Sequence, residues 1–347
     1  MQSRSDLPLG DLEEIVRRSA NLTSELKESK IVITGSTGFV GTWLISSLIT
    51  LNRTHNLGIE FLLPVRNKDR AKKKFMNFPD SRVNFLEIDY LTNSNLPEID
   101  ASHIVFSSTP SQPSTGGDNG SLVEKVSKNS FNSLVEVAKK QKFPPIFCNL
   151  SSGAVYGKKQ LNQGMAKEQS LPLDDHARDL NDYGKIKVEL ELEIEKLTNS
   201  GQIRGANPRL FAFAGPGINL EAHFAIGNFM NNAIKGEEIF IKGNPNTQRS
   251  YLYPTDLIVW LLNLLVNPTI NPTHIGSENL VSISHLAEKI SDVFSSPGVS
   301  TGNELAESSI YVPETSKTRE HLNVSEEVSL GESLIRWKNW LTSQPRN

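Results

Sequence analysis

The chain of 347 residues contains a single cysteine, Cys148, so it can form no internal disulfide and offers no cysteine-rich metal site. It also lacks an excess of charge of either sign, because 36 basic and 39 acidic side chains leave a formal net charge of −3. The densest basic run, Lys72–Lys74, is typical of a solvated helix face. We therefore expect neither a metal site nor a nucleic-acid partner.

Long apolar runs are missing as well. The longest apolar stretch, residues 257–266, is far shorter than the ~20 residues that a membrane-spanning helix needs. Residues 1–28 are polar and charged, without the apolar core of a secretory signal. The sequence thus predicts a cytoplasmic protein without a membrane partner.

What the sequence does contain is a regular alternation of apolar and amphipathic segments. Apolar runs of strand length occur at residues 30–34, 61–65, 83–88, 104–107, 144–151 and 206–213. Helical periodicity occurs at residues 40–51, after 69, and at 121–140 and 182–197. Parallel strands need long crossovers, which are normally helices, so this order predicts an α/β fold with a doubly wound parallel sheet of the Rossmann type.

Three regions are expected along the chain. Residues 1–29 are predicted to be an N-terminal helical extension with one helix over residues 11–26, and residues 30–214 the dinucleotide-binding domain. From Gly215 onward the pattern loosens into loops rich in Gly, Pro and Asn, with helices near 226–235, from 254 and from 283, and a strand at 238–242. Residues 215–347 are therefore predicted to form a smaller α/β substrate lobe, interleaved with the first domain.

A glycine-rich segment, Thr34–Gly41, directly follows the first predicted strand and opens the first predicted helix. In this context Gly35 permits a tight turn, Gly38 lets the backbone approach a pyrophosphate, and Gly41 allows close helix packing. The helix N-terminus presents N–H donors to the phosphates. We expect a dinucleotide to bind here, with further contacts from Thr37, Phe39 and Val40.

The end of the second predicted strand bears on the choice of cofactor. An acidic residue there would bind the adenine ribose and favour NAD(H), whereas this chain reads Leu63-Pro64-Val65-Arg66-Asn67. Arg66 could pair with a 2′-phosphate, so NADP(H) is favoured and NAD(H) stays open. Further cofactor contacts are predicted after the third and fourth strands, from Asp89, Tyr90 and Ser108.

Tyr183 and Lys187 stand four residues apart on one face of the helix predicted at 182–197. The Lys187 ammonium and the positive nicotinamide of an oxidised cofactor would lower the pKa of Tyr183 from about 10 toward neutrality. Tyr183 could then act as general acid or base on a sugar hydroxyl or carbonyl. A serine after the fifth strand lies at the sheet edge where ligands bind, with Ser152 the first choice and Ser151 the second.

Together these motifs resemble the extended short-chain dehydrogenases/reductases of the NAD-dependent epimerase/dehydratase family, which act on nucleotide sugars. The resemblance spans roughly residues 30–290 and rests on the glycine loop, Ser152 before Tyr156-Gly157, Tyr183 with Lys187, Arg209-Leu210-Phe211 before Gly215-Pro216, and Arg249-Ser250-Tyr251 before Asp256.

The resemblance assigns roles to single residues. It implies that Ser152 and Tyr183 contact the reacting sugar oxygen and that Lys187 binds the nicotinamide ribose. It also implies that Asn129 supports the site, and that Asn228 and Arg249 hold the diphosphate of a nucleotide-diphosphate sugar. A homodimer through the helices at 121–140 and 182–197 is expected on the same grounds.

Departures from the family pattern narrow the reaction. Sugar 4,6-dehydratases carry an Asp-Glu pair just after the serine, where this chain has Gly153 and Ala154. Reductases that also epimerise carry a cysteine after the serine pair, whereas Cys148 precedes it. With dehydration and combined epimerisation and reduction disfavoured, we expect hydride transfer at a single carbon of the sugar, most readily C4.

Two reactions fit such a transfer. The leading interpretation, which depends on Arg66, is a 4-ketoreductase that reduces a nucleotide-diphosphate 4-keto-6-deoxyhexose with NAD(P)H. The alternative is a nucleotide-sugar 4-epimerase with tightly bound NAD. A 4,6-dehydratase and a non-catalytic dinucleotide-binding protein are disfavoured.

Overall fold

The computed structural model describes residues 7–92, 95–108, 119–162, 164–169, 179–220, 224–302 and 307–343. Its centre is a parallel six-stranded sheet in the order β3-β2-β1-β4-β5-β7. The strands are β1 (Lys30–Ile33), β2 (Glu60–Val65), β3 (Val83–Glu87), β4 (His103–Phe106), β5 (Ile146–Asn149) and β7 (Arg204–Ala206). The strand order reverses between β1 and β4, as in doubly wound dinucleotide-binding folds, so the predicted fold class is confirmed.

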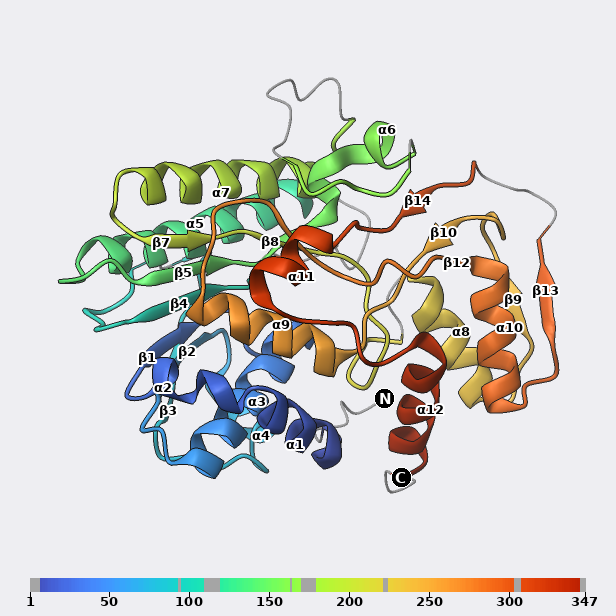
Figure 1. Cartoon of the computed structure of the whole chain (residues 1–347), viewed down its shortest axis with the longest axis horizontal. Helices are drawn as coiled ribbons and strands as arrows, with labels where there is room; N and C mark the ends of the chain where they lie inside the picture. The colour runs from blue at the N-terminus through green and yellow to red at the C-terminus, as the bar shows by residue number, and fades with distance from the viewer. Residues whose placement is uncertain are drawn as a thin grey trace.

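Helices cover both faces of this sheet (Figure 1). On one face, α3 (Phe39–His55) and α9 (Pro254–Val266) share an apolar core with the strands. On the other, α5 (Asn119–Lys139) and α7 (Asp182–Asn199) do the same. The short helix α4 (Lys68–Lys74) connects β2 to β3. Burial on both faces explains why the central strands read as nearly continuous apolar runs.

Two segments predicted as single strands are divided in the structure. β5 ends at Asn149 and β6 (Ser151–Ser152) follows in a second sheet, while β7 ends at Ala206 and is followed there by β8 (Pro208–Leu210). Asn149 Nδ2 donates a hydrogen bond to Asn207 Oδ1 at 2.8 Å, at the point where the segments after β5 and β7 leave the main sheet. Pro208 has no N–H with which to continue the ladder. The second sheet, completed by β11 (Thr273–Ile275), holds Ser152 just beyond the carboxyl end of β5.

The lobe after residue 215 packs α8 (Ala225–Ile234), α10 (Ile283–Phe294) and α12 (Leu330–Ser343) around its own apolar core (Figure 1). Its strands form two small sheets, β12-β10-β14 and β13-β9. Their bounds are β9 (Ile239–Ile241), β10 (Gln248–Arg249), β12 (Val281–Ser282), β13 (Val299–Thr301) and β14 (Ile310–Tyr311). In contrast, α9 packs on α3, and β11 pairs with β8 beside α11 (Ser316–Leu322). Residues after 215 thus contribute to both parts of the molecule.

The N-terminal extension is not the continuous helix predicted over residues 11–26. Helix α1 (Leu9–Arg18) ends at the buried Ser19, and a 3-10 turn η1 (Ala20–Leu22) and the short α2 (Thr23–Leu26) lead to β1. Small polar residues such as Ser19 favour turns and caps over helix interiors, which accounts for the break. Helix α1 packs on both α3 and α9.

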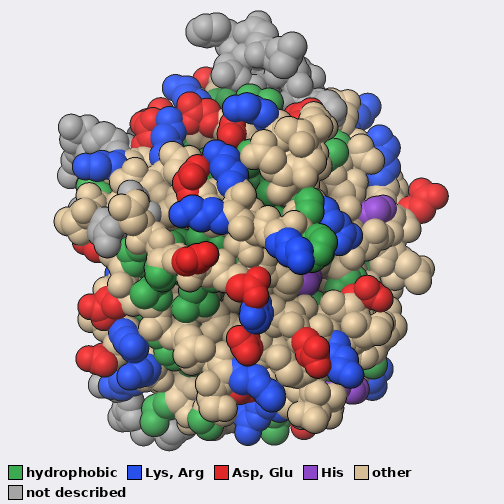
Figure 2. Space-filling view, turned by 90° about the vertical axis from the view of Figure 1, so that its left-hand side faces the viewer, with side chains coloured by type: hydrophobic (Ala, Val, Ile, Leu, Met, Phe, Trp, Pro, Cys, Tyr) green, Lys and Arg blue, Asp and Glu red, His purple; other side chains and the backbone are tan. Residues whose placement is uncertain are grey.

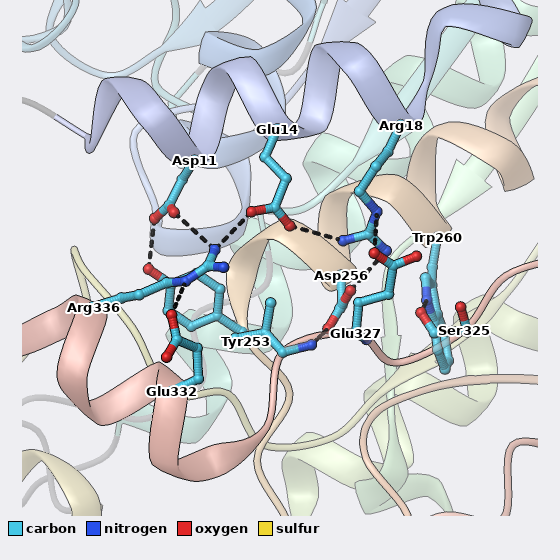
Figure 3. A network of polar contacts seen from close by, with 11 residues as sticks. Asp11, Glu14, Arg18, Tyr253, Asp256, Trp260, Ser325, Glu327, Glu332 and Arg336 are labelled. Atoms are coloured by element: carbon cyan, nitrogen blue, oxygen red, sulfur yellow. Dashed lines mark hydrogen bonds and ion pairs between the residues drawn. The ribbon is translucent and has the colours of Figure 1, made fainter.

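A network of charged side chains joins α1 to α9 and α12 (Figure 3). Arg18 pairs with Asp256 of α9 at 2.8 Å. Arg336 of α12 pairs with Asp11 at 3.2 Å and with Glu14 at 2.7 Å. Ion pairs therefore connect the N-terminal extension to α9, which packs on the main sheet, and to α12, the last helix of the lobe.

The face shown in Figure 2 carries acidic and basic side chains interspersed with one another. Within the described residues no helix is long and apolar enough to span a bilayer. The same residues contain no group of three His, Cys, Asp or Glu side chains that could hold a metal ion. The cytoplasmic location stays a prediction.

Candidate active site

The turn between β1 and α3 is built by close backbone approach. Gly35 has a φ of +66°, and a Cβ there would lie 2.3 Å from the carbonyl oxygen of Ser107. A Cβ at Gly41 would lie 2.2 Å from the carbonyl oxygen of Gly35. Both positions therefore require glycine. Gly35 lets the loop lie against the residues that follow β4, and Gly41 lets helix α3 start close to the loop.

This loop leaves donors without partners, as a dinucleotide site should. Helix α3 has no side-chain cap, and the N–H groups of Phe39, Val40 and Gly41 have no acceptor among the described residues. The buried hydroxyls of Ser36 and Ser108 also lack partners there. Free donors at a helix N-terminus fit the pyrophosphate of a dinucleotide.

Two basic residues flank the glycine loop. Arg66 directly follows β2 and is exposed, so the second strand lies where the sequence places it. Lys74 of α4 donates a hydrogen bond to the carbonyl oxygen of Thr37 at 2.7 Å and so ties α4 to the loop. Burial and the nearby charge of Arg70 lower the pKa of Lys74.

The residues after β3 make local contacts. The exposed carboxylate of Asp89 accepts from the backbone N–H of Leu91 at 3.0 Å, as a turn residue does. Tyr90 is buried, and its carbonyl oxygen accepts from Asn129 Nδ2 at 2.7 Å. Asn129 thus supports this loop from α5. The cofactor contacts of Asp89 and Tyr90 and the catalytic role of Asn129 stay predictions.

Tyr183 and Lys187 lie on the first turns of α7, which Asn181 caps by accepting from the N–H of Gly184 at 2.8 Å. The Lys187 ammonium lies 5.7 Å from the centre of the Tyr183 ring and donates to the carbonyl oxygen of Leu150 at 2.6 Å. Its side chain is buried, and burial lowers the pKa of Lys187 to about 7. The charge of Lys187 is therefore sensitive to its surroundings.

Burial also raises the pKa of Tyr183, with a further rise from Tyr311, while a hydrogen bond with Ser152 opposes the rise. The predicted lowering, which needs both the Lys187 ammonium and the nicotinamide of the oxidised cofactor, stays a prediction, since desolvation by burial is the largest influence in the chain by itself. A lower pKa depends on the second charge in that prediction, the positive nicotinamide of the oxidised cofactor.

The two serines of β6 have different surroundings. Ser152 Oγ lies 3.4 Å from the hydroxyl of Tyr311 and accepts from the N–H of Ala154 at 3.2 Å. The Ser151 hydroxyl donates instead to the buried carboxylate of Glu191. The structure thus groups Ser152 with Tyr183 and gives Ser151 a partner away from that pair.

Tyr311 is a site residue that the sequence reasoning missed. It comes from β14, in the lobe, and a Cβ at Gly153 would lie 2.9 Å from its hydroxyl oxygen. The same Cβ would lie 2.6 Å from Cε1 of Phe211. A side chain at residue 153 would therefore fit beside Ser152 only if Phe211 and Tyr311 moved.

The predicted diphosphate-binding residues come from the lobe. Arg249 of β10 pairs in register with Tyr311 of β14, which brings it to the side of the site. Its guanidinium donates to the carbonyl oxygens of Gln248 and Ser309 and to the Ser309 hydroxyl at 2.8, 3.1 and 3.1 Å. Asn228 is exposed near the start of α8. Diphosphate binding by Arg249 and Asn228 stays a prediction.

Residues 31–275 match the family model described as the NAD dependent epimerase/dehydratase family. UDP-glucuronic acid decarboxylase 1 of Arabidopsis thaliana is 25% identical over 321 residues, which cover 89% of this chain and 69% of the relative.

Solved structures show the same fold. UDP-N-acetylglucosamine 4-epimerase from Methanobrevibacter ruminantium M1, in complex with UDP-N-acetylmuramic acid, is similar with a TM-score of 0.73 at 17% identity, covering 92% of this chain and 100% of that one. dTDP-glucose 4,6-dehydratase from Bacillus anthracis, in complex with NAD, has a TM-score of 0.72 at 15% identity. The match covers 90% of this chain and 96% of the dehydratase chain.

Proposed function

Because the chain belongs to the NAD-dependent epimerase/dehydratase family of extended short-chain dehydrogenase/reductase enzymes, we propose that it is a 4-epimerase of a nucleotide-diphosphate sugar. The family is NAD-dependent, and the dehydratase relative binds NAD. The three relatives are named for decarboxylation, epimerisation and dehydration, so the choice among these reactions has to come from the site.

Gly153 carries the proposal. Eliminating water from the sugar ring requires an acid and a base in addition to the groups that act at C4. Phe211 and Tyr311 occupy the space that a side chain at residue 153 would need, and Ala154 follows it. Ser152, Tyr183 and Tyr311 then supply the hydroxyls of the site, which suits proton and hydride transfer at a single carbon.

The roles of the residues follow from their positions. Bound NAD would supply a reversible hydride acceptor. Tyr183 takes the proton from the sugar O4 as C4 is oxidised, and Ser152 donates a hydrogen bond to the same oxygen. Lys187 binds the nicotinamide ribose and its positive charge stabilises the tyrosinate. Because the hydride would be returnable to either face of the C4 carbonyl, such a site would allow inversion at C4, with Tyr183 giving the proton back to O4.

Reduction of a 4-keto-6-deoxy sugar is the second candidate, and Arg66 favours it. In that reaction the hydride moves once, and the nicotinamide leaves oxidised. An exposed guanidinium after β2 suits the 2′-phosphate of NADPH, the usual donor of reducing equivalents in such a step.

A substrate panel separates the two candidates. UDP-glucose, UDP-N-acetylglucosamine and UDP-glucuronic acid are incubated with the purified protein without added cofactor, and dTDP-4-keto-6-deoxyglucose is incubated with NADH or NADPH. An epimerase interconverts C4 stereoisomers without consuming cofactor, whereas a reductase oxidises one NAD(P)H for each keto sugar. Chromatography of the sugars and cofactor absorbance measure both.

Tyr183→Phe is the control for this panel. We expect it to reduce turnover by about 10²–10⁴-fold, the usual contribution of a general acid or base, while NAD binding stays nearly unchanged. Release of carbon dioxide or water by the wild type would contradict a reaction confined to C4. Full activity of Tyr183→Phe would contradict the assigned mechanism.

A further inference from the structure

A buried carboxylate lies one helical turn beyond Lys187. Glu191 of α7 is 6% exposed, and it receives hydrogen bonds from groups on two strands of the second sheet. From β8, Arg209 Nε donates to Glu191 Oε1 and Oε2 at 3.1 and 3.3 Å, and Arg209 Nη2 donates to Oε2 at 2.8 Å. From β6, the Ser151 hydroxyl donates to Oε1. The hydride-transfer steps described above use none of these contacts.

A chain of contacts leads from Arg209 to the segment that follows Tyr311 in the sequence. Arg209 Nη1 donates to the Tyr156 hydroxyl at 2.7 Å, and that hydroxyl lies 2.5 Å from His274 Nε2. His274 Nδ1 lies 2.6 Å from the carbonyl oxygen of Glu314, three residues beyond Tyr311. Burial lowers the pKa of His274 to about 3, so the ring is neutral at neutral pH. The carboxylate is thus held rigidly by a connected set of buried groups.

The surroundings of Lys187 contain few groups that favour its charge. Its ammonium has the Leu150 carbonyl oxygen as acceptor and lies near the rings of Phe106 and Tyr183. Burial works against the charged form, and the negative charge of Glu191 works for it. Other titratable or polar groups of the second sheet and its neighbours are the Ser152 hydroxyl beside the Tyr311 phenol, the Tyr156 phenol beside neutral His274, and the Arg209 cation, which pairs with Glu191 itself.

We propose that Glu191 is a positioning residue for the reaction, which keeps the Lys187 ammonium charged beside Tyr183 and, through Ser151, fixes the strand that carries Ser152. The proposal rests on the Tyr183–Lys187 chemistry of the proposed function. Glu191 touches neither sugar nor cofactor in this scheme. It acts through Lys187 by charge and through β6 by a hydrogen bond.

Glu191→Gln tests the charge, because the amide keeps nearly the same shape and can still accept from Ser151. Lys187 must be protonated for activity, and loss of the neighbouring negative charge lowers its pKa. The unpaired Arg209 cation acts in the same direction. We expect the alkaline limb of the kcat profile to move to lower pH by about one unit, with KM for the nucleotide sugar unchanged.

Three further variants separate charge from architecture. Glu195→Gln, at an exposed position of the same helix, should keep the wild-type profile. Glu191→Asp keeps the charge and should keep the alkaline limb near its wild-type pH even where kcat falls. Glu191→Gln combined with Arg209→Gln removes the ion pair as a unit. If the pair is purely structural, this double variant should regain the wild-type profile. Under the proposal the profile stays shifted, but by less than in Glu191→Gln alone, because the opposing Arg209 cation is also gone.

Titration of the Lys187 side chain by ¹⁵N NMR measures the pH at which its ammonium loses its proton, independently of enzyme turnover. Circular dichroism and NAD binding first establish that each variant is folded. If Glu191→Gln alone does not fold, the double variant Glu191→Gln/Arg209→Gln becomes the test, and an unshifted alkaline limb in it would overturn the proposal. Lys187 titrating at the same pH in the wild type and in Glu191→Gln would overturn the proposal, whatever the substrate. A wild type inactive on the whole panel would instead count against the proposed function, so the two failures are distinguishable.

Discussion

In our prediction, the choice between NAD(H) and NADP(H) depends on Arg66. It stands directly after β2 and is exposed, at the point where an acidic residue would bind the two ribose hydroxyls. A guanidinium there can pair with a 2′-phosphate but gives the hydroxyls no acceptor. The family is NAD-dependent, so Arg66 bears on whether NADP(H) is accepted as well.

Replacing Arg66 by Asp should weaken NADPH binding relative to NADH binding by about tenfold or more, because the pair with the 2′-phosphate is lost and repulsion replaces it. Fluorescence titration of each reduced cofactor measures the ratio of dissociation constants. Lys72→Asp, at an exposed position of α4, is the matched control and should change the ratio little. A ratio unchanged in Arg66→Asp would show that this side chain does not contact the adenosine half.

At the same scale, spacing along one helix was enough to predict that Tyr183 and Lys187 lie together. A Tyr-x-x-x-Lys pair is local, since residues four apart share a helical face. Glu191 lies four residues further on that face, so the same spacing could have revealed it. Tyr311 could not be found this way, because it belongs to a strand of two residues whose position depends on pairing with β10.

Among the elements, α1 has the clearest energetic role. Its Arg18 reaches Asp256 of α9, whose side chain is fully buried and also accepts from the backbone N–H groups of Glu327 and Val328 at 3.1 and 3.0 Å. Burial raises the pKa of Asp256, and Arg18 and these N–H groups oppose the rise. The buried carboxylate therefore depends on α1 for its charged partner.

Arg18→Met should lower the free energy of unfolding by about 3 kcal/mol, because it leaves Asp256 buried without its cation. Chemical denaturation measures the change. Arg17→Met, at the neighbouring exposed position of α1, should lie within about 0.5 kcal/mol of the wild type. Equal stabilities of the two variants would show that α1 contributes only apolar packing.

Long elements were predicted well and short ones poorly. The helices α3, α5 and α7 and the strands β1, β2 and β4 follow from period and apolar content, because each buries a face large enough to show in the sequence. The edge strand β3 is only partly buried, and its apolar residues still mark it. The division of β5 from β6 and of β7 from β8 does not, since it depends on a contact between Asn149 and Asn207 that only the folded chain makes. The strands of the lobe, at two or three residues each, are too short to show an alternation of apolar and polar residues.

For the whole molecule, a homodimer through α5 and α7 remains a proposal with physical support. The two helices lie side by side, joined by Lys128–Glu189 at 2.7 Å, and they leave Leu122 and Leu192 exposed at 47% and 53%. Adjacent helices with exposed leucines are suited to pack against a second copy.

Sedimentation equilibrium should therefore give a dimer, and Leu192→Glu should shift it to monomer, because a carboxylate would be buried at the contact without a partner. Ile335→Glu, on the exposed side of α12, is the matched control and should leave the dimer intact. A monomeric wild type, or a dimer that Leu192→Glu does not weaken, would refute the arrangement.

The crowding at Gly153 has a consequence for the redesign of this enzyme. Residue 153 meets Phe211 of the first domain and Tyr311 of the lobe, so its allowed side chains are decided by parts of the chain that lie far from it in sequence. Grafting an acidic pair onto residues 153 and 154 would not create a dehydratase on the present scaffold. Phe211 and Tyr311 would both have to move or be replaced as well, so a redesign would have to change residue 153 and its two aromatic neighbours together.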